Sequence, residues 1–166
     1  MRDAIHLRPM MADDLEFMYS VYANTRLDEL AVTGWSDVQK EQFLRMQFGA
    51  QHRYYQEQFP DASYQVIEWQ SRPVGRFYVH RRKQEIGIID VSLLPSYRGQ
   101  GLGGLLVREV LAEGAAAQIP VRIHVERFNP ALRLYERLGF RCIADQGIYL
   151  HMEWTPPAAD AVERNQ

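Results

Sequence analysis

A glycine-rich segment in the second half of the chain is the clearest candidate for a binding site. It runs from Arg98 to Gly104 with the sequence Arg-Gly-Gln-Gly-Leu-Gly-Gly, so four of its seven residues are glycine. An apolar stretch precedes it and a helical pattern follows it, which predicts that the segment opens a helix. Backbone N–H groups at a helix N-terminus bind anions, and glycine lets a ligand approach them closely. The segment therefore predicts a phosphate or pyrophosphate site.

Two other kinds of phosphate loop share part of this pattern. A P-loop has Lys and then Ser or Thr after its last glycine, whereas two leucines follow Gly104. The dinucleotide fingerprint G-x-G-x-x-G is matched by Gly99, Gly101 and Gly104, and Glu126 ends the next predicted strand. However, four residues separate the preceding strand from Gly99, and the 40 residues after Glu126 are too few to complete a dinucleotide-binding domain.

A second segment, Asn129–Phe140, has the sequence Asn-Pro-Ala-Leu-Arg-Leu-Tyr-Glu-Arg-Leu-Gly-Phe. Asn129 and Pro130 are typical N-cap and N1 residues, and Gly139 is a typical C′ residue. These residues predict a short helix that carries Tyr135.

The two segments together resemble the GNAT (GCN5-related) N-acetyltransferases. Arg98–Gly103 is similar to the acyl-CoA pyrophosphate motif R-x-x-G-x-G of that family, and Asn129–Phe140 to its second characteristic motif. Val91–Pro95 is similar to the strand that leads into the loop, and the order of predicted elements matches from Ile5 to Trp154. The resemblance implies an α+β fold, with flanking helices around a mixed, mostly antiparallel sheet that contains one parallel, splayed strand pair.

The resemblance also implies that acetyl-CoA is the co-substrate, and no metal site is expected. The pyrophosphate is expected on the amides from Gln100 to Gly104, the pantetheine arm on main chain near Leu93, and Arg98 as a support of the loop. Asn129 is expected to bind the pantetheine arm, to cap its helix, or both. The residues expected to bind the co-substrate are Leu93, Arg98, Gly99, Gln100, Gly101, Leu102, Gly103, Gly104 and Asn129.

Acyl transfer to an amine requires two proton transfers. An amine with a pKa near ~10 must lose a proton before it attacks the thioester, and the leaving thiolate benefits from a general acid. By its motif position Tyr135 is the family's tyrosine acid, although the ring could instead only pack in the core. Asp90 lies within an apolar strand, where burying a charge is costly unless the charge is paired. It is therefore a candidate for the general base or for a structural hydrogen-bonding partner. Many family members use a water relay instead, so the base remains open.

The implied function is transfer of an acetyl or short acyl group to a primary amine by direct attack in a ternary complex. A non-catalytic acyl-CoA-binding or sensing module on the same fold is the alternative. The acceptor is a small-molecule or peptide amine, and nothing in the sequence selects among these. Candidate residues on the acceptor side are Tyr22, Asp28, Glu29, Trp35, Tyr54 and Tyr149.

The hydrophobic periodicity predicts the elements that hold these residues. Expected strands are 5–8, 64–69, 74–79, 86–94, 121–125, 140–144 and 148–154, and expected helices begin near residues 13, 38, 102 and 129. The strands between residues 64 and 94 form an antiparallel meander, and a helix connects 86–94 to a parallel partner at 121–125.

The composition is that of one soluble domain, expected at 1–154, with a loose tail at 155–166. The 166 residues carry a net charge of −2, which argues against a nucleic-acid partner. No apolar run reaches ~18 residues, so no membrane span is expected. The N-terminus lacks an apolar signal region, and a single cysteine fits a reducing compartment, so a cytoplasmic protein is expected. The resemblance allows a homodimer, but the sequence reveals no interface.

Overall fold

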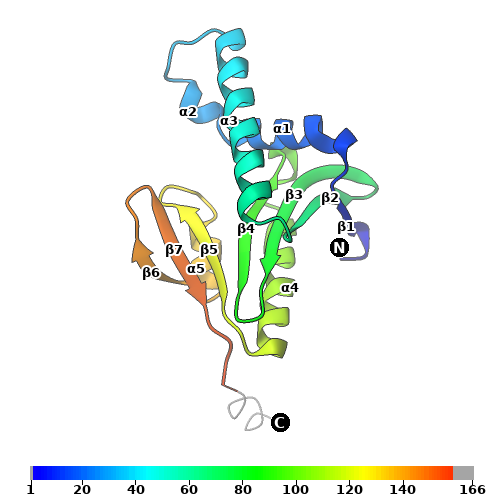
Figure 1. Ribbon diagram of the computed structural model, residues 1–166, viewed down its shortest axis with the longest axis vertical. Helices are drawn as coiled ribbons and strands as arrows, with labels where there is room; N and C mark the ends of the chain where they lie inside the picture. Colours follow the sequence, from blue (N-terminus) through cyan, green and yellow to red (C-terminus); the bar gives the residue numbers. More distant parts are fainter. Residues whose placement is uncertain (1, 159–166) are drawn as a thin grey trace. The chain divides into compact units, whose positions relative to one another are not determined.

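The computed structural model describes residues 2–158 and contains one seven-stranded sheet. The strands follow the order β1-β2-β3-β4-β5-β7-β6 across the sheet (Figure 1). The strands are β1 (Ile5–Pro9), β2 (Ser63–Trp69), β3 (Arg72–Arg81), β4 (Ile86–Leu93), β5 (Val121–Glu126), β6 (Arg141–Asp145) and β7 (Tyr149–Trp154). The α-helices are α1 (Leu15–Asn24), α2 (Leu27–Leu30), α3 (Asp37–Gln58), α4 (Leu102–Ala117) and α5 (Leu132–Arg137). Short 3₁₀ turns are η1 (Arg2–Ala4), η2 (Ala12–Asp14) and η3 (Pro95–Tyr97).

The strand directions confirm the predicted mixed sheet. β1 is antiparallel to β2, and β7 is antiparallel to both β5 and β6. The parallel pair is β4 with β5, where Ile86–Ile88 lies in register with Val121–Ile123. A helical connection separates these two strands, as parallel neighbours require. Within β4, Ile86 and Ile88 are buried, whereas Ile89–Leu93 is half-buried.

The chain divides into two compact units. The first contains the chain up to Tyr78 together with Asp90–Gln100, and the second contains Val79–Ile89 and the chain from Gly101 onward. The sequence-based expectation of a single domain at 1–154 stays a prediction. Of the expected tail, residues 159–166 lie outside the described residues.

Helices of the first unit form their own small core. Figure 1 shows α3 crossing α1, and the buried side chains between the helical segments are Tyr19, Tyr22, Leu30 and Leu44. A capping box begins α3, because Ser36 Oγ accepts from the Gln39 N–H at 3.2 Å and Gln39 Oε1 accepts from the Ser36 N–H at 2.9 Å. Helix α3 continues for 22 residues, although Leu44 is its one fully buried side chain.

Helix α4 packs closely on strands of the second unit. A Cβ at Gly114 would lie 3.0 Å from the Ile119 carbonyl oxygen and 3.0 Å from Val121 Cγ2, so a larger residue would displace the helix. Helix α5 begins at Leu132 with Ala131 as its N-cap, two residues later than the predicted cap at Asn129. The difference arises because Asn129 first forms a turn, in which its Oδ1 accepts from the Ala131 N–H at 2.9 Å.

Within residues 2–158, the helices are all too short or too polar to span a bilayer.

Candidate active site

The loop between η3 and α4 is built around two glycines with left-handed backbone. Gly99 has φ +73° and Gly101 has φ +85°, a region that glycine adopts without the steric cost of a Cβ. Gly101 is the N-cap of α4, and residues 98–101 are exposed. A Cβ at Gly99 would meet nothing within 4 Å, so the loop surface is open there. The first N–H groups of an α-helix lack intrahelical partners, so the start of α4 offers donors to an anion.

The side chain of Arg98 fastens this loop to the end of β4. Its Nε donates to the Leu93 carbonyl oxygen at 2.9 Å, and its Nη2 reaches the Asn24 carbonyl oxygen at 3.5 Å. Gln100 Nε2 donates to the Ser96 carbonyl oxygen at 3.1 Å, inside the same loop. The structure thus brings Arg98 and Leu93 together, and the bonding of Arg98 fits a residue that supports the loop.

Tyr135 lies in the packed interior of the second unit. Its side chain is 4% exposed, and its ring meets the Phe140 ring edge-on at a centroid distance of 5.8 Å. The backbone fixes this placement, because the Phe140 N–H donates to the Tyr135 carbonyl oxygen at 3.0 Å. The ring therefore contributes to packing, and proton donation by its hydroxyl stays a prediction.

Asp90 is one member of a polar cluster in the first unit. Arg76 Nε donates to Asp90 Oδ2, and Ser92 Oγ donates to Asp90 Oδ1 at 2.9 Å. On its other side, Arg76 Nη2 donates to Gln51 Oε1 of α3 at 3.0 Å. A charge in an apolar strand requires a partner, and Arg76 of β3 supplies it.

Sequence reasoning missed Arg76. The signal was present, because Arg76 interrupts the apolar run of β3 just as Asp90 interrupts the run of β4. Two opposite charges in two successive apolar strands indicate a buried ion pair.

Two histidines of the second unit also form a pair. His124 of β5 and His151 of β7 lie in register and stack with 4.1 Å between ring centroids. Burial lowers the pKa of His124, and the neighbouring charge of His151 lowers it further. The pairing of His124 with His151 depends on the strand register, which residue types alone leave undetermined.

The acceptor-side candidates of the first unit are used in part for packing. The Tyr22 hydroxyl donates to Gln47 Oε1 at 2.9 Å, and the Trp35 ring meets Phe43 at 5.1 Å. Trp35 and Phe43 border a shallow hollow of about 340 Å³ along α3, together with Gln39, Gln42 and Met46.

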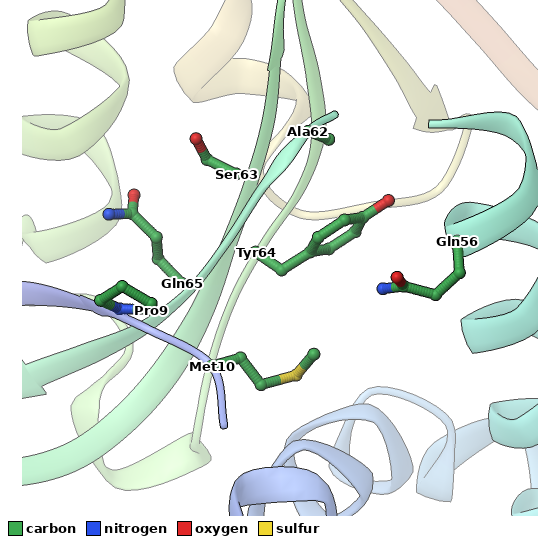
Figure 2. A pocket seen from close by; sticks show the side chains of 7 residues that line it. All are labelled: Pro9, Met10, Gln56, Ala62, Ser63, Tyr64 and Gln65. Atoms are coloured by element: carbon green, nitrogen blue, oxygen red, sulfur yellow. The ribbon is translucent and has the colours of Figure 1, made fainter. Parts of the chain in front are cut away.

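A second hollow lies between the end of β1, the start of β2 and α3. It has a volume of about 350 Å³, and Figure 2 shows its lining side chains, with Tyr64 and Gln65 pointing to opposite sides of β2. The Tyr64 hydroxyl lies 2.8 Å from the Tyr55 carbonyl oxygen and 2.7 Å from that of Phe59, so it serves the C-terminal end of α3. Burial raises the pKa of Tyr64 to about 12, so this phenol stays protonated at neutral pH. The hollow contains none of the predicted site residues.

The model of the acetyltransferase (GNAT) family matches residues 27–140. The chain belongs to the GNAT acetyltransferase family. The match includes both segments on which the resemblance rested, Arg98–Gly104 and Asn129–Phe140, and it confirms that resemblance. No curated protein sequence matches the chain significantly.

Solved GNAT structures share the fold of this chain. The PaiA N-acetyltransferase of Thermoplasma acidophilum, in complex with coenzyme A, aligns with a TM-score of 0.69 and 19% identity over 91% of this chain and 98% of its own. A GNAT acetyltransferase of Elizabethkingia anophelis with acetyl-CoA bound has a TM-score of 0.56 and 15% identity, covering 92% and 99%. Naa50 of Arabidopsis thaliana, in complex with the bisubstrate analogue CoA-Ac-MVNAL, has a TM-score of 0.58 and 17% identity, covering 90% and 97%. Across these distant GNAT proteins it is the fold that is shared.

Proposed function

We propose that this GNAT protein is an N-acyltransferase that transfers an acetyl or short acyl group from acyl-CoA to a primary amine. The geometry of the loop carries the proposal. Gly99 and Gly101 have left-handed backbone, and Arg98 fastens the loop to the Leu93 carbonyl oxygen. In this conformation the first N–H groups of the 16-residue helix α4 can donate to a ligand. Coenzyme A in the T. acidophilum structure and acetyl-CoA in the E. anophelis structure support acetyl-CoA as the co-substrate.

The proposed co-substrate site uses main chain more than side chains. The amides from Gln100 to Gly104 would bind the pyrophosphate, and main chain near Leu93 would bind the pantetheine arm. Asn129 Oδ1 is engaged by the Ala131 N–H, so its amide nitrogen is the group left to donate to the arm.

Two side chains have proposed roles in proton transfer. The amine nitrogen attacks the thioester carbonyl carbon, the carbon–sulfur bond breaks, and the sulfur leaves as a thiolate. As the amide forms, the nitrogen gives up its second proton, which restores the hydroxyl of the tyrosine that protonates the sulfur. Asp90, directly or through one water, takes the proton that the ammonium must lose, and Tyr135 donates a proton to the thiolate. The amine attacks directly in a ternary complex, without a covalent acyl-enzyme. The exposed Cys142 takes no part in this scheme.

The acceptor is a small-molecule or peptide amine. The peptide part of the analogue bound to the A. thaliana protein makes a peptide N-terminus one class worth testing. We expect the reaction in the cytoplasm, without a nucleic-acid or membrane partner, and the family resemblance allows a homodimer.

A non-catalytic acyl-CoA-binding module is the second candidate function. The observation that favours it is the burial of Tyr135 against Phe140, because a packed tyrosine need not exchange protons. Such a module would keep the loop and its ligand but would not release free thiol.

An amine panel with thiol detection separates the two functions. Acetyl-CoA is mixed with L-lysine, spermidine, tyramine or the peptide MVNAL, and free CoA is followed with a thiol reagent, with acylated product checked by mass spectrometry. Amine-dependent thiol release with product supports the enzyme. Tight acetyl-CoA binding without any product supports the binding module and would overturn the proposed activity.

A further inference from the structure

We propose that Arg76 is a positioning residue, which with Gln51 and Ser92 holds the Asp90 carboxylate in place to receive the acceptor amine. This inference rests on the proposed function and deepens it. It adds a side chain that neither of the two sequence motifs contains, and it commits Asp90 to contact with a cationic group of the acceptor.

The two members of the ion pair differ in their access to solvent. The Arg76 side chain is 4% exposed, whereas the Asp90 side chain is 22% exposed. Asp90 is therefore the more exposed member of the pair, and it is the member that a ligand can approach.

The guanidinium of Arg76 is fixed from several sides. Gln51 of α3 accepts from its Nη2 at 3.0 Å, and its Cζ lies 5.7 Å from the Tyr22 ring centroid and 4.9 Å from that of Tyr78. Cation–π contacts with two rings favour the planar guanidinium, and lysine cannot reproduce the planar fork of donors. Arg76 is thus held as a rigid donor on which the orientation of Asp90 depends.

Both carboxylate oxygens of Asp90 have a donor, yet neither is saturated. Oδ2 accepts from Arg76 Nε and Oδ1 accepts from Ser92 Oγ at 2.9 Å. A carboxylate offers about four acceptor positions, so two remain for the N–H groups of a ligand. An ammonium is the complementary partner, because it donates and carries positive charge.

Titratable side chains from several elements surround the Arg76 guanidinium. From α3, burial and the charge of Arg76 lower the pKa of His52, which favours the neutral imidazole. From β3, burial raises the pKa of Tyr78, so this phenol stays protonated. Burial lowers the pKa of Arg76, but the charge of Asp90 and the remaining contacts outweigh it, and the pKa is raised. Tyr22 of α1 and Tyr55 of α3 complete the titratable surroundings.

The first test compares Arg76→Lys with Arg45→Lys. Arg45 of α3 is a matched control, because it also pairs with carboxylates and lies over a tyrosine ring, but at an exposed site. We expect Arg76→Lys to lower kcat/KM for the amine on the order of 10- to 100-fold, the cost of a misplacement of about 1 Å, with KM for acetyl-CoA unchanged. Arg45→Lys should match the wild type.

A second variant separates a positioning role from a purely structural one. The pair Arg76→Met with Asp90→Leu removes both charges together, and such apolar replacements often preserve the fold. We expect this folded double variant to bind acetyl-CoA and to lose amine turnover. Wild-type turnover by the folded double variant, or by Arg76→Lys, would overturn the proposal.

A binding measurement that does not depend on turnover tests the role of Arg76 separately from the proposed acyltransferase activity. The protein is labelled with ¹³C at aspartate carboxyls, and the Asp90 resonance is assigned by its loss in Asp90→Asn. The best amine of the panel, or spermidine if none reacts, should move this resonance in the wild type and much less in Arg76→Lys. If it does so while no acetyl transfer occurs, the proposed activity fails and the positioning role stands. If the wild-type resonance does not respond, the positioning role is wrong whether or not the protein is an enzyme.

Discussion

At the scale of single residues, Tyr135 provides the sharpest test of catalysis. Its ring is buried against Phe140, and Tyr135→Phe keeps the ring while removing only the hydroxyl. We expect kcat to fall on the order of 100-fold or more, within the range of general acid catalysis, with acetyl-CoA affinity nearly unchanged. The measurement is steady-state thiol release together with calorimetric binding of acetyl-CoA.

Tyr64→Phe is the matched control for this substitution. It also deletes a hydroxyl from a partly buried ring, but that hydroxyl bonds to carbonyl oxygens at the end of α3. Its loss should cost about 0.5–1.5 kcal/mol of stability and leave kcat unchanged. Equal turnover of Tyr135→Phe and the wild type would remove Tyr135 from the mechanism and leave it a packing residue.

Residue identity could be predicted from the sequence only where a motif or a local pattern isolates the residue. Arg98 and Tyr135 are singled out by their places in two motifs, and their roles in the site stay predictions. Asp90 stood out as a charge in an apolar strand, but its partner Arg76 is 14 residues away in the chain. Such a pairing depends on strand register, which residue types alone leave undetermined.

At the scale of elements, the start of α4 depends on Gly101. This residue is the N-cap at φ +85°, where a β-branched side chain is strongly disfavoured, and a side chain there would also crowd the proposed phosphate path. We expect Gly101→Val to abolish CoA binding as measured by calorimetry. The control is Gly147→Val, because Gly147 has the same φ of +85° in the turn between β6 and β7 and an added Cβ meets nothing within 4 Å. Normal CoA binding by a folded Gly101→Val protein would rule out the loop as the phosphate site.

The approach of β3 to the end of β4 depends on another glycine. A Cβ at Gly75 would lie 2.3 Å from the Ser92 carbonyl oxygen and 2.9 Å from Leu93 Cδ2, so the backbone must shift to accept it. We expect Gly75→Ala to lower the free energy of unfolding by about 1–3 kcal/mol, as overpacking does, in urea denaturation. Gly87→Ala in β4 is the control, since its nearest contact is the His80 carbonyl oxygen at 3.9 Å and the change should stay within about 1 kcal/mol. Equal stability of the two variants would show that the strands have room to separate at Gly75.

Element boundaries followed from local chemistry where that chemistry was decisive. The start of α3 was expected near residue 38 and lies at Asp37, because the capping box at Ser36 involves only neighbouring residues. Asn129 was predicted to cap α5 but forms a turn before the helix, because the same side chain can make either hydrogen bond. The short helix α2 has no periodic signal in four residues and was not predicted.

At the scale of the whole molecule, the strand order was the part of the fold least accessible to local patterns. Alternation predicted the strands, and the connection through α4 predicted the parallel pair of β4 and β5. The insertion of β7 between β5 and β6 follows from the register of a hairpin and carries no local sequence signal. The architecture of the whole sheet was predicted only from the resemblance of the element order to that of the GNAT family.

Ligand-dependent stability of the full chain tests the central proposal without any knowledge of the acceptor. Because each kcal/mol shifts Tm by about 2–4 °C in a domain of this size, a ligand at ~100 times its Kd, worth ~2.7 kcal/mol, should raise Tm by roughly 5–11 °C. We expect acetyl-CoA and CoA to produce such a shift in a thermal-shift assay, and NADH at the same concentration to produce none. The Gly101→Val protein should show no rise in Tm with acetyl-CoA or CoA, whereas the Gly147→Val protein should show the same rise as the wild type. A shift with NADH alone would instead mean that Gly99, Gly101 and Gly104 act as a dinucleotide fingerprint, and the chain would then combine a GNAT fold with a different phosphate ligand.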